Sequence, residues 1–207
     1  MAVYRRAWLL LPSVVVCSAC ARTSMVSVPT PAAAGRPLHT VLVIAHLADP
    51  GLSAETERRF VAAGGRGRTR FIASQAVLFP GREDDSADLA SIVRRDQVDG
   101  ILVISSSESG ARRDSVATSY TTIGCAVWTA EIGCQDVPVV VPGYQTSTPW
   151  AQFTARVYDA ATGEPLWSAF STTRGTTYAG ATTLVHSMAA TTLARLARDG
   201  VIRGPIP

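Results

Sequence analysis

Residues 40–45 read TVLVIA, a continuous aliphatic run that predicts a β-strand covered on both faces. Two further apolar runs follow, RFIA at 70–73 and ILVI at 101–104, each separated from the one before by enough residues for a helix. The β-α-β-α-β order predicts parallel strands joined by right-handed crossovers.

Both intervening segments carry helix signals. Ser53 precedes two glutamates and predicts the N-cap of a first helix, with Phe60, Val61 and Ala63 as its buried stripe. The acidic stretch 83–86 predicts the start of a second helix, whose buried side is formed by Leu89, Ile92 and Val93.

The second half of the chain changes character. Residues 118–128 and 137–141 are rich in Thr and Val and predict antiparallel strands or an excursion from the sheet. Residues 151–158 and 165–171 alternate on either side of a turn and predict a hairpin, and the alanine-rich stretch 179–198 predicts a C-terminal helix. The predicted fold class is therefore α/β: a β-α-β-α-β start, then antiparallel strands with a C-terminal hairpin, closed by a helix packed on the mixed sheet.

The N-terminus has the features of an export signal. Arg5 and Arg6 precede an apolar run over 7–16 that contains Pro12, and small residues lead to Cys20. The run is far shorter than the roughly 20 apolar residues that span a bilayer. Residues 1–19 are therefore predicted to be a signal peptide.

This segment resembles the signals of bacterial lipoproteins, which implies that Cys20 carries the lipid. Ala21 follows it rather than an acidic residue, and by resemblance to Gram-negative lipoproteins this favours the outer membrane, with the domain facing the periplasm. Cys17 stands where lipoprotein signals usually have an aliphatic residue, and Ala19-Cys20-Ala21 also suits ordinary signal peptidase. A soluble periplasmic or secreted protein is the alternative.

Composition suggests how the remainder is organised. Residues 20–37 are small or rigid and predict a lipidated N-terminus followed by a flexible tether, and 38–203 a single globular domain. The chain has 19 basic and 16 acidic residues, and two of the arginines lie in the signal. No clustered basic sequence argues for nucleic acid, and the expected partners are the membrane and an envelope protein.

Cys125 and Cys134 are the two cysteines left after processing. An even pair in an exported domain predicts a disulfide, which would stabilise by roughly 2–3 kcal/mol in the chain-entropy model. A redox-active pair would need the closer C-x-x-C spacing.

The segment 157–168, VYDAATGEPLWS, resembles a hairpin found in many bacterial envelope lipoproteins. In these an exported α/β domain carries a strand, a D-x-x-T-G turn, a strand with Trp and then a C-terminal helix. The curli-secretion lipoprotein and the lipoprotein activators of penicillin-binding proteins share this layout, as do several uncharacterised lipoprotein families. The resemblance implies a fold and no functional residue, and Asp159 and Gly163 also suit a turn on physical grounds.

Enzyme and cofactor motifs are missing from the sequence. The stretch 105–110, SSSESG, lacks the G-x-S-x-G of a hydrolase elbow and predicts a polar loop. The chain has no Lys and so no phosphate-binding P-loop. His39, His46 and His186 lack metal-site spacing, so we expect no enzyme activity, metal or cofactor.

One group of polar residues follows the predicted parallel strands. Their carboxyl ends are the usual ligand crevice of an open sheet, and His46, Asp49, Ser74, Ser105 and Glu108 would meet there. This edge is the candidate site of the alternative function, a periplasmic small-ligand-binding protein or enzyme. These side chains could equally satisfy loop backbone groups.

The leading hypothesis is a non-enzymatic envelope lipoprotein that binds another protein or assists an assembly. Four aromatic residues in the second half, if exposed, could anchor such a partner or could cover the core: Tyr120, Trp128, Tyr144 and Trp150.

Overall fold

The computed structural model describes residues 20–33, 37–64, 68–78, 86–128 and 131–203, and over 86 and 116–144 it describes the backbone alone. The predicted signal peptide lies outside these ranges. The strands are β1 (Ala21–Pro29), β2 (Thr40–His46), β3 (Arg70–Ala73), β4 (Gly100–Trp128), β5 (Glu131–Asp159) and β6 (Pro165–Gly175). The helices are α1 (Pro50–Gly64), α2 (Ser86–Arg95) and α3 (Ala181–Arg198), with 3-10 turns η1 (Pro31–Ala33) and η2 (Ser74–Ala76).

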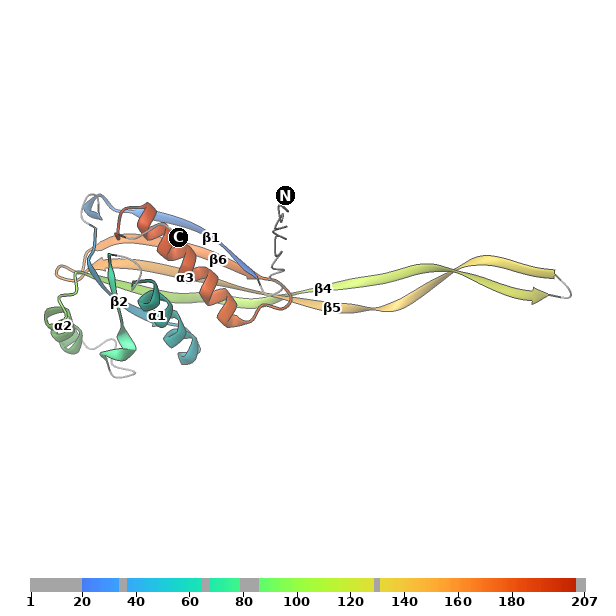
Figure 1. Cartoon of the computed structure of the whole chain (residues 1–207), viewed down its shortest axis with the longest axis horizontal. Coiled ribbons are helices and arrows are strands. Elements are labelled where there is room, and N and C mark those ends of the chain that lie inside the picture. The colour runs from blue at the N-terminus through green and yellow to red at the C-terminus, as the bar shows by residue number, and fades with distance from the viewer. Residues whose placement is uncertain (1–19, 34–36, 65–67, 79–85, 129–130, 204–207) are drawn as a thin grey trace, which may run out of the picture.

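All six strands form one mixed sheet in the order β1-β6-β5-β4-β2-β3 (Figure 1). β2 pairs in parallel with β3 and β4, while β4-β5, β5-β6 and β6-β1 are antiparallel. The predicted fold class is confirmed, including the parallel β-α-β-α-β unit, the C-terminal hairpin and the closing helix.

Helices cover both faces of the sheet, though unequally. The larger core lies beneath α1 and α3 and includes Phe60, Trp167 and Met188, each fully buried. The smaller core, around Leu42 and Ile44 on the opposite face, packs against α2. α2 covers the β2 side alone, so the outer face of β1 and β6 is left open, with these large apolar side chains exposed: Val26, Val28 and Phe170.

The hairpin between β5 and β6 turns as its residue types require. The Asp159 carboxylate accepts hydrogen bonds from the backbone N–H groups of Ala161 and Thr162, at 2.8 and 3.0 Å. Gly163 then adopts φ +74°, a conformation that residues with a Cβ rarely take. The D-x-x-T-G stretch is thus an Asx-type turn.

The predicted tether over 20–37 is wrong for residues 21–33. Ala21–Pro29 is the edge strand β1, paired with β6 from Ala21↔Gly175 to Pro29↔Trp167, and η1 follows it. Its inward residue Met25 is 8% exposed and packs in the larger core, and this apolar contact orders the segment. The folded domain therefore begins at residue 21 and not at 38.

The other difference lies between β4 and β5. Ser105–Gly110 was predicted as a loop, yet β4 continues through it with a bulge between Ser106 and Glu108. Pairing of β5 with β6 ends at Trp150↔Arg174, and β4 and β5 run on together to Trp128↔Glu131. We call residues 111–149 the ribbon. It extends far past the rest of the sheet (Figure 1).

No helix within the described residues is long and apolar enough to cross a membrane.

Candidate functional site

The carboxyl edge of the parallel strands is closed by side chains from α1. Glu57 is 1% exposed, and its carboxylate accepts the backbone N–H of Ala45 at 3.1 Å, the Ser74 hydroxyl at 2.7 Å and the backbone N–H of Gln75 at 3.0 Å. β3 ends at Ala73, so the Ala45 N–H has no strand partner on that side. Glu57 supplies the missing acceptor, which is the role a buried polar group usually has.

Asp49 is the residue that begins α1. Its Oδ1 accepts the backbone N–H of Gly51 at 2.7 Å and lies 3.4 Å from that of Leu52, and Pro50 follows as the first helical residue. The predicted N-cap, Ser53, is instead buried inside the helix, where its hydroxyl accepts the Leu47 N–H at 3.1 Å. A side-chain acceptor before a proline satisfies the free N–H groups of the first turn.

The structure brings together only part of the predicted ligand edge. His46 and Ser105 are direct register partners on β2 and β4. His46 lies two residues after Ile44, on the same face, and Ser105 follows Ile104, which points to the other face, so both polar residues lie on the face opposite α1. Ser74, in contrast, is buried against Glu57. Glu108 lies beyond the bulge, exposed and paired with Gln152. The five residues therefore do not form one crevice.

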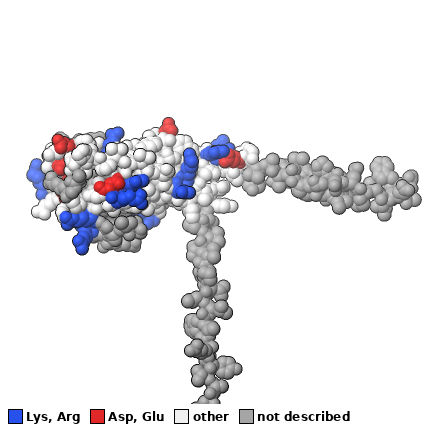
Figure 2. All heavy atoms as spheres, turned by 90° about the horizontal axis from the view of Figure 1, so that it is seen from above, with Lys and Arg blue, Asp and Glu red and all other residues white. Residues whose placement is uncertain are grey.

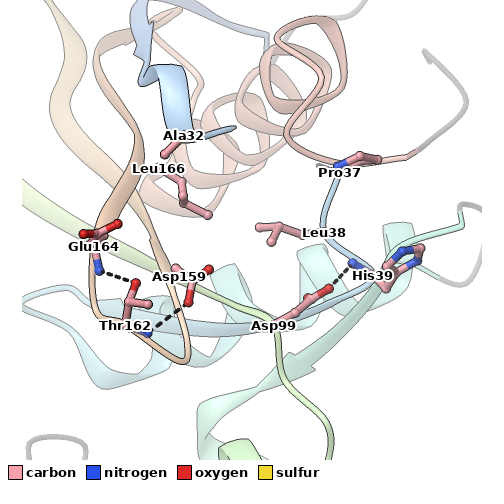
Figure 3. A pocket seen from close by; sticks show the side chains of 9 residues that line it. All are labelled: Ala32, Pro37, Leu38, His39, Asp99, Asp159, Thr162, Glu164 and Leu166. Carbon is pink, nitrogen blue, oxygen red and sulfur yellow. Dashed lines mark hydrogen bonds between the residues drawn. The ribbon is translucent and has the colours of Figure 1, made fainter. Parts of the chain in front are cut away.

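A pocket of about 280 Å³ lies at the opposite end of the sheet (Figure 3). Asp99 accepts the backbone N–H groups of His39 and Thr40 at 2.7 and 2.8 Å, and Asp159 holds the hairpin turn. The carboxylates of Asp99 and Asp159 therefore hold the backbone around the pocket. The lining residues are Ala32, Pro37, Leu38, His39, Asp99, Asp159, Thr162, Glu164 and Leu166.

Sequence reasoning missed this pocket, although Asp99-Gly100 and the D-x-x-T-G turn mark two of its walls. Among the described residues, no three His, Cys, Asp or Glu side chains are grouped to hold a metal ion.

Glu55, Arg59 and His186 link α1 to α3 at the surface. Arg59 Nη2 lies 2.6 Å from His186 Nδ1, and His186 Nε2 lies 2.6 Å from Glu55 Oε1. Because a guanidinium can only donate, Nδ1 accepts and Nε2 carries the proton that it donates to the carboxylate. That hydrogen bond, aided by Arg58 and Arg59, lowers the pKa of Glu55. The described contacts of this cluster thus join α1 to α3 through a carboxylate, a guanidinium and an imidazole.

The predicted lipid-bearing residue stands at the start of β1. The Cys20 carbonyl accepts the Thr176 N–H at 2.9 Å, so no spacer separates Cys20 from the sheet. At the far end of the ribbon, Cys125 is the register partner of Cys134. The side chains of this pair lie outside the described residues, so the disulfide stays a prediction.

Comparison with protein-family models and with curated proteins gives no match. Among solved structures, the chain is similar to a PelC dodecamer variant from Paraburkholderia phytofirmans, with 14% identity, coverage of 82% of this chain and 96% of that one, and a TM-score of 0.48. It is also similar to lipoprotein GNA1162 from Neisseria meningitidis, with 14% identity, coverage of 77% and 99%, and a TM-score of 0.41.

Proposed function

We propose that this chain is an exported, lipid-anchored accessory protein of the cell envelope that has no enzymatic activity and binds a protein partner through the ribbon. The observation that carries the proposal is the ribbon itself, two long strands that pair with each other and with no other strand of the sheet.

An isolated two-stranded ribbon has two free backbone edges. Each edge presents unpaired N–H and C=O groups that can add a strand from another chain, and a lone hairpin is marginally stable in water. Charged residues that would discourage such pairing are sparse. Arg112, Arg113 and Asp114 lie at the base of the ribbon, and beyond them only Glu131 and Asp136 occur over 115–149. We infer that the ribbon gains its order by adding a partner strand.

The two edges differ in sequence. β5 carries Pro138, Pro142 and Pro149, each of which lacks an N–H, whereas β4 has no proline from 111 to 128. The β4 edge is therefore the better template for strand addition, and we assign it as the docking edge.

The non-enzymatic part of the proposal is supported by the hydrogen bonds of the candidate acids. Glu57, Asp49, Asp99 and Asp159 all accept backbone N–H groups. A general acid or base has to be within reach of a substrate, and these four carboxylates are engaged in holding the fold.

The anchoring part of the proposal rests on the signal-like N-terminus and on Cys20. Ala21 after Cys20 favours the outer membrane, with the domain in the periplasm. Intact-mass measurement of the membrane-extracted protein tests this. We expect the mass of an acylated chain beginning at Cys20, and a soluble protein from Cys20→Ser. An unmodified wild-type chain would exclude the anchor.

Site-specific photocrosslinking in living cells tests the docking edge. A photoreactive residue replaces Ser115 or Thr118 on β4, with Arg94 on α2 as the matched surface control. We expect a discrete crosslinked species from the β4 positions and none from Arg94, and mass spectrometry tells a second copy from another envelope protein. The proposal fails if neither β4 position gives a discrete species.

A ribbon-deleted variant provides the complementary arm. Gly110 and Trp150 are register partners, so an Asn-Gly turn can join them in place of 111–149. The partner should be lost while the thermal unfolding of the remaining sheet stays cooperative. If purified complexes keep the partner without the ribbon, docking lies elsewhere.

A further inference from the structure

Cys20 is level with the base of the ribbon. Ala21 pairs with Gly175, and one position further along, Arg174 pairs with Trp150, which in turn pairs with Gly110. Because the Cys20 carbonyl bonds to Thr176, this end of the sheet is fixed within a residue or two of the predicted lipid attachment. A lipid on Cys20 would hold this end of the domain against the bilayer.

Two arginines at this end lie opposite each other on β1 and β6. Arg22 on β1 and Arg174 on β6 are direct register partners, and both are exposed. Like charges directly opposite are unfavourable in a sheet. Within the described part of the chain, neither arginine forms an ion pair. An external anion would relieve this repulsion.

Two more arginines follow at the start of the ribbon. Arg112 and Arg113 are exposed, and Arg112 pairs with Asp114 at 3.1 Å. Figure 2 shows blue side chains at this end of the domain, with few red ones beside them. We call Arg22, Arg112, Arg113 and Arg174 the arginine collar.

Acidic and aromatic side chains also lie near the arginine collar. The acids on β4 are Glu108 and Asp114, so the four arginines of the collar lie near two carboxylates. Within the described residues, only Arg112 of the collar forms an ion pair, with Asp114. Tyr178, in the loop after β6, is 78% exposed, and an amphipathic aromatic ring suits the membrane interface.

We propose that the arginine collar binds the anionic headgroups of the membrane in which the lipid of Cys20 is embedded. Guanidinium groups bind phosphate oxygens through paired hydrogen bonds, and basic residues beside a lipid anchor add electrostatic attraction to an anionic surface. A single acyl signal binds weakly, and a basic patch is a common second signal. This inference rests on the proposed lipid anchor and adds that anionic phospholipids bind the domain beside it.

Vesicle sedimentation with the mature Cys20→Ser protein tests the collar apart from acylation, because this protein carries no lipid. The vesicles contain phosphatidylcholine alone or phosphatidylcholine mixed with phosphatidylglycerol. We expect binding only to the mixed vesicles. Replacing both Arg22 and Arg174 by Gln should weaken it by about thirty-fold.

The matched control replaces Arg68 and Arg94, two exposed arginines at the other end of the domain, by Gln and leaves the same net charge. Binding by this control should equal that of the parent. The proposal is overturned if the parent ignores phosphatidylglycerol, if the collar variant binds like the parent, or if both variants weaken equally.

Urea unfolding separates a lipid contact from a structural role. Since Arg22 and Arg174 repel each other, the collar variant should unfold at the same urea concentration as the parent or a higher one. A collar variant that binds less and also unfolds earlier would point to a structural role and would overturn the proposal. If Cys20 is not acylated in cells, the proposed lipid anchor is excluded. The binding of the unacylated protein to anionic vesicles is a separate result and would still stand.

Discussion

The carboxylate of Glu57 accepts a hydrogen bond from the Ser74 hydroxyl at 2.7 Å, although both side chains are only 1% exposed. The same carboxylate accepts two backbone N–H groups, so one α1 side chain completes the edges of β2 and β3. The crevice that an open parallel sheet often offers to a ligand is filled here by the protein itself.

Replacing Glu57 by Ala should lower the free energy of unfolding by about 3 kcal/mol or more, because buried donors lose their acceptor. Glu57→Gln keeps one acceptor oxygen and should lose less. Urea denaturation measures both, with the exposed Glu164→Ala as control. A loss of under about 0.5 kcal/mol for Glu57→Ala, the range of ordinary surface substitutions, would show that water replaces the carboxylate.

Asp49 and His46 should differ sharply in their effect on stability. Asp49→Ala removes the N-cap of α1 and should cost about 1 kcal/mol, whereas the exposed His46→Ala should cost less than about 0.5 kcal/mol. Both values come from the same denaturation series. Equal effects would mean that α1 begins without help from Asp49.

Asp199 should contribute more to stability than its position after α3 suggests. Its Oδ2 accepts the indole N–H of the fully buried Trp167 at 2.8 Å and the Ser27 hydroxyl at 2.6 Å, which ties β1 and β6 to α3. Asp199→Ala should therefore cost about 1–3 kcal/mol. In a Ser27→Ala background the cost should fall, since one of the two donors is gone. Identical costs in both backgrounds would show that Asp199 and Ser27 are not coupled.

The Glu55–His186 pair should make stability depend on pH. The folded-state pKa of Glu55 is lowered, first by the His186 hydrogen bond, so its contribution is present above the unfolded-state pKa and is lost as the pH falls through the folded-state pKa. Glu55→Gln should thus be less stable than wild type at pH 7, by up to about 1 kcal/mol for a surface pair, and equal to it in strong acid. Unfolding at both pH values measures the gap, and a gap that persists in acid would contradict the sign.

Cys125 and Cys134 should be oxidised in the exported protein. They are direct partners in an antiparallel ladder, where Cα atoms lie about 4.5–5.5 Å apart, within the range that a disulfide spans. Alkylation followed by mass spectrometry should label neither cysteine before reduction and both after it. Labelling without reductant would show that the ribbon holds two thiols.

The core of the fold could be predicted because its residues carry a one-dimensional signal. Residues 41–45 are buried on both faces of the sheet. Leu184 and Met188 recur at helical spacing on the buried side of α3. Burial imposes such patterns on a sequence. The parallel unit, the C-terminal hairpin and α3 therefore follow from the apolar pattern alone.

The antiparallel strands predicted over 118–128 and 137–141 lie in β4 and β5, but the base of the ribbon and the strand β1 could not be predicted from an alternating apolar pattern. Arg112 and Arg113 are exposed, as are Val26 and Val28 on β1, and so apolar and polar residues do not alternate with the pleat. The stretch after residue 28 is rich in proline and alanine, a composition typical of flexible tethers, and the segment was therefore predicted as one. Pairing with the remote strand β6, as between Thr23 and Thr173, decided the structure of β1, whereas in the ribbon β4 and β5 pair with each other.

The candidate site was misjudged for a related reason. An acid in the first turns of a helix reads as a solvated side chain, yet Glu57 lies four residues after Ser53 and three before Phe60, on the same buried side. Helical spacing alone would have placed it inward. Helical spacing does not predict that β3 ends at Ala73. This early end leaves the backbone N–H of Ala45 without a strand partner, and the Glu57 carboxylate accepts its hydrogen bond.

The pairing of β1 with β6 also sets a time order for folding. The Thr23 and Thr173 hydroxyls are hydrogen-bonded across 150 positions, so β1, the first strand of the described sheet, cannot pair until β6, the last strand, has been made. Such closure is slow because a long loop must be ordered first. In a chain translocated from its N-terminus, β1 would emerge early and stay unpaired at the membrane. An anchor at Cys20 would keep that exposed strand in place until β6 arrives to receive it.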